Sequence, residues 1–155
     1  MKSTILIVLA FMVVAGAAFA GTAEGEKEIG GLVAYMSPDE GDDTTFAQIF
    51  GGYFVTDQWQ AKLAFSAFSI EGDISGTIGG GADYHFSIEN PDIVPYAGAV
   101  LTTSYGDVDS GTQIDLHVGA KMFVSEGTAF NASVSYFTGG DLDMMMALLG
   151  ISVFL

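Results

Sequence analysis

The feature that most constrains this chain is a repeated alternation between polar and apolar residues that begins near residue 28. In residues 113–122 every even position is apolar, and every odd position is polar, charged or Gly. Residues 131–136 alternate in the same way, and residues 60–67 do so with the opposite parity. Because successive side chains of a β-strand point to opposite faces, each segment is expected to be a strand with one apolar face.

Gly, Asp, Ser and Pro interrupt this pattern and divide it into eight expected strands. The expected strands are residues 28–36, 45–55, 59–69, 74–87, 94–105, 113–124, 128–137 and 143–155. The connections alternate between acidic, Gly-rich segments and mostly tighter turns. This alternation indicates a series of antiparallel hairpins.

The placement of charge indicates that the barrel spans a membrane. The chain has 19 Asp and Glu against 4 Lys and Arg, and the acids are concentrated in the connections, whereas the strand faces carry mostly Gly, Ser, Thr, Gln and Asn. A membrane barrel places apolar side chains on lipid and polar ones in its lumen, and lipid requires closure because an open edge leaves backbone groups unpaired. We therefore expect an all-β, eight-stranded antiparallel up-and-down transmembrane β-barrel, with ten strands as the alternative.

The N-terminus is typical of a secretory signal peptide. Lys2 precedes an apolar run over residues 5–20 that ends in Ala18-Phe19-Ala20. A basic start, an apolar core and an A-x-A end predict cleavage after Ala20. The alternative, a membrane anchor, is disfavoured because the run is shorter than the roughly 20 residues that cross a bilayer. We expect a signal peptide over 1–20, a short tail over 21–27 and the barrel over 28–155.

The composition excludes several classes of function. With no Cys, the chain has no disulfide, thiolate metal site or cysteine nucleophile. Nucleic acid is not an expected partner, because phosphate binding needs clustered Lys and Arg and this chain has no Arg. Two His make a His-rich metal site improbable, so we expect no cofactor and no specific metal.

A small group of charges is expected inside the barrel. The interior of an eight-stranded barrel is filled by side chains, and charges in so narrow a space need partners. A turn centred near Gly72 sets Lys62 opposite Asp83, which predicts an ion pair, and Lys121 with Asp115 supplies a second part of the network. The expected lumen network is Lys62, Asp83, Asp115, Lys121, His85 and His117.

The aromatic residues predict a girdle at one end of the barrel. Such rings prefer the interface between membrane and water. The expected periplasmic girdle, all on the lipid face, is Tyr53, Trp59, Tyr84, Phe86, Tyr96 and Phe130.

The remaining acids are expected outside the membrane. Glu24, Glu26 and Glu28 are assigned to the N-terminal tail. The acidic outer loops with the capacity for weak cation binding contain Asp39, Glu40, Asp42, Asp43, Asp107 and Asp109. They lack the spaced ligands of a calcium loop, so the alternatives are diffuse binding of divalent cations and a solvated acidic rim.

Two segments carry a resemblance to a known family. Residues 52–59, G-Y-F-V-T-D-Q-W, and residues 94–99, V-P-Y-A-G-A, resemble strands of small outer-membrane barrels of the OmpA, OmpX and OmpW type. The resemblance implies a monomer in the outer membrane, in contact with lipid or lipopolysaccharide. It also implies recognition of the C-terminal strand by the outer-membrane assembly machinery. Such chains usually end in Phe, whereas this one ends in Phe154-Leu155.

The expected function is non-enzymatic, with a structural or surface-interaction role. His85-Phe86-Ser87 resembles the His-x-Ser pairing of outer-membrane lipid A deacylases, in which His activates Ser. That chemistry must face the outer leaflet, whereas the expected topology puts His85 at the periplasmic end, so lumen packing is favoured. The alternatives are a narrow channel or hydrophobic-solute conduit of OmpW type and a secreted soluble barrel of lipocalin type.

Overall fold

All eight expected strands are present. A computed structural model of the chain describes residues 22–36, 44–70, 73–90, 92–105, 111–139 and 144–155. Every expected strand boundary lies within two residues of the observed one. The strands are β1 Lys27–Met36, β2 Thr44–Phe54, β3 Trp59–Ile70, β4 Asp73–His85, β5 Ile93–Tyr105, β6 Thr112–Ser125, β7 Thr128–Thr138 and β8 Met144–Phe154.

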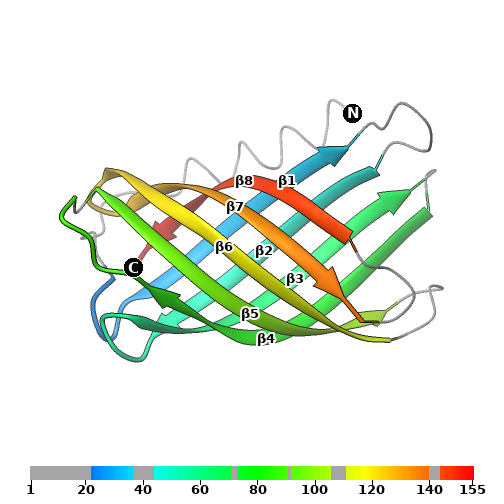
Figure 1. The fold of residues 1–155 in the computed structure, drawn as a ribbon, viewed down its shortest axis with the longest axis horizontal. Coiled ribbons are helices and arrows are strands. Elements are labelled where there is room, and N and C mark those ends of the chain that lie inside the picture. Colours follow the sequence, from blue (N-terminus) through cyan, green and yellow to red (C-terminus); the bar gives the residue numbers. More distant parts are fainter. Residues whose placement is uncertain (1–21, 37–43, 71–72, 91, 106–110, 140–143) are drawn as a thin grey trace.

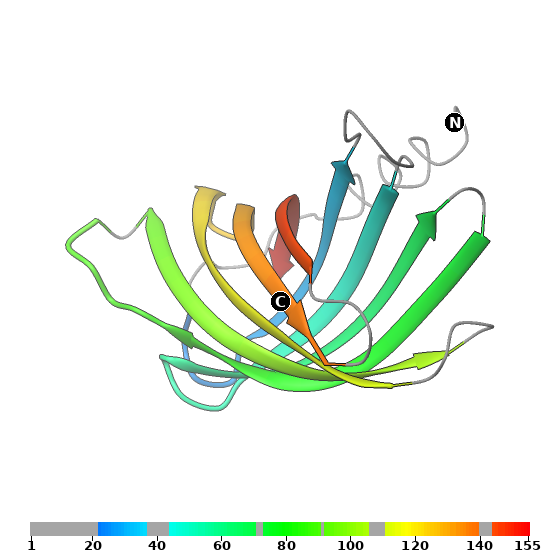
Figure 2. The same cartoon turned by 45° about the vertical axis from the view of Figure 1, so that its right-hand side comes forward.

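The strands form a closed antiparallel barrel in sequence order, which confirms the predicted fold class (Figure 1). Each strand pairs with the next, and β1 closes the barrel by pairing with β8 from Glu28↔Phe154 to Val33↔Leu149. The strands are strongly tilted and curved around the interior (Figure 2). We call the end at which β1 begins and β8 ends the turn end, because the short turns over residues 55–58 and 126–127 lie there.

The two faces of the sheet carry the opposite polarity to that of a soluble barrel. On β3, Leu63 points outward with 62% of its surface exposed, whereas Lys62 beside it points inward and is 6% exposed. Leu116 and Val118 of β6 are likewise exposed. The barrel therefore exposes an apolar face and buries charged side chains such as Lys62 in its lumen, as lipid requires. None of the described residues forms a helix that is long and apolar enough to span a membrane.

The interior is less uniformly polar than the sequence predicts. One apolar cluster lies away from the turn end, and a second, smaller one lies at the turn end. The first contains Leu32, Ala34, Phe46, Phe50, Ala64, Val100, Phe137, Met146 and Leu148. The second contains Phe54, Ala129 and Phe154, with Phe123 packed against it. On β8 the inward residues pass from Leu148 through Gly150 and Ser152 to Phe154, so a polar layer separates the two clusters.

Candidate functional site: the lumen network

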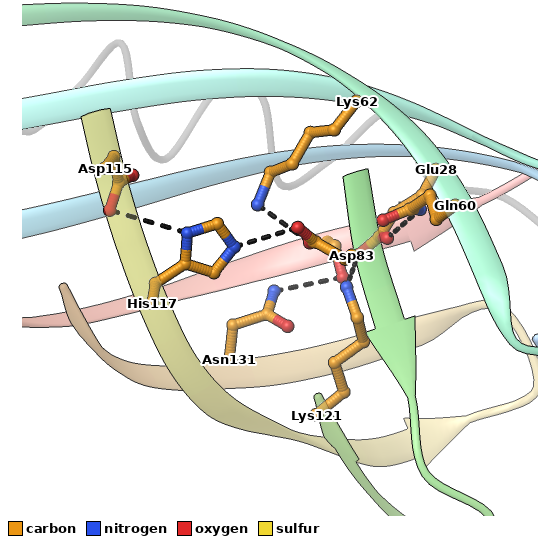
Figure 3. Close-up of polar contacts among 9 residues, drawn as sticks. Glu28, Gln60, Lys62, Asp83, Asp115, His117, Lys121 and Asn131 are labelled. Carbon is orange, nitrogen blue, oxygen red and sulfur yellow. Dashed lines mark hydrogen bonds and ion pairs between the residues drawn. The ribbon is translucent and has the colours of Figure 1, made fainter. Parts of the chain in front are cut away.

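The first half of the polar layer is centred on Asp83 (Figure 3). Its Oδ2 lies 3.0 Å from Lys62 Nζ, and its Oδ1 lies 2.8 Å from His117 Nε2. His117 Nδ1 in turn lies 3.4 Å from Asp115 Oδ1. The predicted Lys62–Asp83 ion pair is therefore present, and the imidazole of His117 bridges two carboxylates.

The strand register that creates this ion pair differs from the expected one. Gln60 is the residue opposite Asp83, and Lys62 is opposite Gly81. The Lys62 side chain reaches Asp83 diagonally, because residues two positions apart on neighbouring strands remain within reach of a long side chain.

The second half of the layer is centred on Glu28, which the sequence reasoning placed in the tail. Glu28 belongs to β1 and is fully buried. Its Oε1 lies 2.5 Å from Lys121 Nζ, and its Oε2 accepts a hydrogen bond of 2.6 Å from Gln60 Nε2. Strand parity alone would have predicted that Glu28 points into the lumen. Tyr35 points outward, and side chains an odd number of residues apart on one strand point to opposite faces of the sheet.

The predicted pairing of Lys121 with Asp115 is wrong. Both residues belong to β6, and six residues of a strand span about 20 Å, which is too far for contact. Lys121 pairs instead with Glu28 across the lumen, and Asp115 contacts His117. Among the described residues, the buried charged side chains are thus two lysines and three carboxylates.

Two glycines make room for the network. A Cβ on Gly98 would collide with Asp83 Oδ1 and lie 2.8 Å from His117 Nε2 and 2.7 Å from the Ala82 carbonyl oxygen. A Cβ on Gly119 would lie 2.7 Å from the Tyr96 ring. Because neither position tolerates a side chain without displacement of its neighbours, glycine here is a requirement of lumen packing.

Tyr96 is not part of the aromatic girdle. It points into the lumen with 4% of its surface exposed. The register pairs it with His85, and directly paired residues share one face of a sheet. Its ring stacks on His85 with centroids 5.7 Å apart and lies 4.9 Å from Lys121 Nζ.

The other five predicted girdle residues lie close to the turn end. Tyr53, Trp59, Phe86 and Phe130 are exposed on the outer face. Tyr84 is half-buried, because its ring stands edge-on to Trp59 and to Phe86, with centroids 5.0 Å apart in both pairs. All five residues lie within two residues of a strand end at the turn end, where a membrane interface would lie.

His85 and Ser87 do not form a nucleophile–base pair. His85 is buried against Phe54, with ring centroids 4.9 Å apart, and neither of its ring nitrogens has a hydrogen-bond partner. Ser87 lies beyond the end of β4 and is exposed. The arrangement lacks the hydrogen bond by which a base activates a serine.

Several predictions concern residues that the structure does not describe. The six acids of the outer loops, Asp39, Glu40, Asp42, Asp43, Asp107 and Asp109, lie outside the described residues, as does the expected signal peptide. Within the described ranges, no group of three or more His, Asp or Glu side chains could hold a metal ion.

A closed antiparallel barrel with an apolar exterior and a charged interior is the arrangement of a transmembrane β-barrel. Residues 6–153 match the family model of the outer membrane protein beta-barrel domain, and the chain belongs to this family. It is thus an outer-membrane β-barrel, as its sequence predicts.

Solved structures share the fold at low sequence identity. The N-terminal barrel domain of OprF from Pseudomonas aeruginosa is 22% identical, with a TM-score of 0.67 over 85% of this chain and 98% of that one. Neisserial surface protein A is 15% identical, with a TM-score of 0.61 over 83% and 95% of the two chains. Ail from Yersinia pestis in a phospholipid nanodisc is 14% identical, with a TM-score of 0.58 over 86% and 99%. No curated protein matches the chain.

Proposed function

We propose that this protein is a non-enzymatic outer-membrane barrel with a side-chain-filled lumen, and that it has a structural or surface-interaction role. The observation that carries the proposal is contact across the lumen. β2 and β6 are four strands apart in a closed order of eight, so they face each other. Lys121 Nζ of β6 nevertheless lies 5.6 Å from the centre of the Phe50 ring of β2. Side chains from opposite walls therefore meet in the middle.

The surrounding contacts leave little room for a passing ion. Lys62 Nζ lies 4.6 Å from the centre of the same Phe50 ring, and Lys121 Nζ lies 5.8 Å from that of Phe154. The two ammonium groups thus lie between the apolar clusters and are fixed by their carboxylate partners. A filled eight-stranded lumen is the expected outcome for this strand number.

Conductance in a planar bilayer tests the proposal. The refolded protein should pass no steady current. Lys121→Ala combined with Phe50→Ala provides the control, because it removes two side chains that meet in the lumen and shows that the assay detects an opened barrel. A steady current through the unmodified protein would refute the filled lumen and favour a narrow conduit of OmpW type.

We further propose that the chain is exported by its N-terminal signal peptide and that it inserts as a monomer. The turn end would then face the periplasm, because membrane barrels place short turns there. The contacts with outer-membrane lipid or lipopolysaccharide would be made by the apolar exterior. The assembly machinery would recognise the C-terminal segment, in which Leu149 of β8 and the following Leu155 are exposed while Phe154 is buried.

Gel mobility and fractionation test this second set of expectations. A folded transmembrane barrel should migrate differently before and after boiling and should sediment with outer membranes after cleavage at Ala20. A soluble, heat-insensitive species would favour a secreted binding barrel. Crosslinking in lipid vesicles should give a single-chain species.

A further inference from the structure

His117 is held between two carboxylates inside the barrel (Figure 3). Its Nε2 faces Asp83 Oδ1 at 2.8 Å, and its Nδ1 faces Asp115 Oδ1 at 3.4 Å. A neutral imidazole carries a proton on only one of its two nitrogens. In either neutral form, the lone pair of one ring nitrogen would therefore point at a carboxylate oxygen. Only the imidazolium presents an N–H group to both carboxylates.

A neutral imidazole would also leave the lumen network one cation short. Each lysine of the network already has a carboxylate partner, in the pairs Lys62–Asp83 and Lys121–Glu28. Asp115 is 2% exposed, and among the described residues the cationic group that contacts it is this imidazole. With a neutral ring, two positive charges face three negative ones, and a buried charge without a partner is costly. With an imidazolium, three cations balance three carboxylates.

The other described groups that face His117 do not change this count. Lys62 of β3 repels an imidazolium, but its ammonium is held by the second carboxylate oxygen of Asp83. The Tyr96 ring of β5 stands edge-on to the imidazole with centroids 6.0 Å apart, and a phenol is uncharged at neutral pH. Ser135 of β7 lies opposite His117 in the register and is also uncharged. Burial opposes a charge on the ring, but a neutral ring would bury an unpaired carboxylate instead.

We infer that the lumen binds one proton on His117 as a structural cation, and that loss of this proton at alkaline pH weakens the barrel. When the ring loses the proton, Asp115 is left buried without a counterion. The outward face and the strand pairing are unchanged by this loss, so its effect falls on the packing of the polar layer. The barrel is thereby sensitive to alkali through a group in its interior.

The sign of the pH dependence follows from the unfolded chain, in which a histidine is neutral above about pH 6.5. Below that pH both states hold the proton, and its contribution to stability is fully present. Above it, unfolding releases the proton to water, so the unfolding equilibrium constant rises with pH. The release of one proton raises this constant by up to about tenfold per pH unit.

Nitrogen NMR of the full barrel, labelled at histidine in micelles, tests where the proton is. The chain has two His, so His85 provides an internal comparison. The ring nitrogens of His85 have no hydrogen-bond partner, and the ring packs against Phe54 and Tyr96, so it is expected to be neutral. At neutral pH both ring nitrogens of His117 should carry a hydrogen, whereas one nitrogen of His85 should not. A bare nitrogen on His117 would overturn the inference.

Urea unfolding in lipid vesicles at about pH 7 and about pH 9 tests whether the proton stabilises the fold. The unfolding equilibrium constant of the unmodified protein should rise between these two conditions. His117→Gln can still donate a hydrogen bond to Asp83 but has no proton to lose, so its constant should change much less. Asp115→Asn should also reduce the change, because the remaining carboxylates each have a lysine. Glu89→Gln makes the same type of charge change at an exposed acid and should keep the full change.

Equal stability of the unmodified protein at both pH values would overturn the inference. So would a pH dependence of His117→Gln or Asp115→Asn as large as that of the unmodified protein, because the titrating group would then lie elsewhere. Loss of the dependence in Glu89→Gln would do the same. Mobility before and after boiling shows for each variant that the barrel is folded. If His117→Gln does not fold, Asp115→Asn and the NMR measurement decide the question.

Discussion

Glu28 is predicted to contribute more to stability than any single exposed acid. In Glu28→Gln the amide retains an acceptor for Gln60, but Lys121 loses its counterion while remaining 1% exposed. Removal of one partner of a buried ion pair costs about 3–5 kcal/mol. The rings of Tyr96, Phe50 and Phe154 contact the Lys121 ammonium in the unmodified protein and in the variant, so these contacts do not reduce the difference. We therefore expect a loss of about 3–5 kcal/mol in the free energy of unfolding.

Lys121→Met separates the effect of the charge from that of packing. Alone it should destabilise the barrel, because Glu28 is then buried without its cation. The double variant with Glu28→Gln and Lys121→Met should lose about 2 kcal/mol less free energy of unfolding than the two single variants lose in sum, because no uncompensated charge remains in it.

Urea unfolding in lipid vesicles provides the measurement. Trp59 is the only Trp and is exposed on the outer face, so its fluorescence reports contact with lipid. Glu89→Gln, at an exposed acid in the β4–β5 connection, should change stability by no more than about 0.5 kcal/mol. If the two single changes add to within about 0.5 kcal/mol, the pair is not coupled and the reasoning is refuted.

Three further changes test other parts of the architecture by the same unfolding assay. Lys62→Met should destabilise the barrel less than Glu28→Gln, because Asp83 keeps His117 as a partner; an equal or larger loss would contradict this. Gly98→Ala should lower stability and broaden the His117 NMR signals, because the new methyl group displaces Asp83; an unchanged spectrum would contradict the packing. Leu116→Lys should cost about 2–4 kcal/mol if its outward site is near the bilayer midplane, and a neutral effect would mean that this face does not contact lipid.

The strands and the closed fold were predictable because they depend on local patterns. Alternation identifies each strand, and charge-poor strand faces with acidic connections identify lipid as the surroundings. The same alternation, taken from strand neighbours of known orientation, places the side chains of Glu28 and Tyr96 in the lumen. The errors arose where a strand end was treated as a tail and where the lipid-facing parity was assigned to Tyr96, which the observed register places in the lumen beside His85.

The partners within the lumen were only partly predictable. Lys62 and Asp83 belong to neighbouring strands, and the connecting turn restricts their separation to a few residues. Lys121 and Glu28 are 93 residues apart in the sequence and meet across the interior. That contact depends on the tilt and stagger of the whole barrel, which no local pattern specifies.

The position of Glu28 has a consequence for the order in which the barrel is completed. Glu28 is on the first strand, whereas its counterion is on the sixth and its amide partner on the third. A chain in which only the early hairpins have formed would bring the Glu28 carboxylate to the edge of the hydrocarbon without its lysine counterion. Entry of such a fragment into lipid is therefore opposed until β6 arrives, so the arrangement favours insertion of a nearly whole barrel over strand-by-strand insertion.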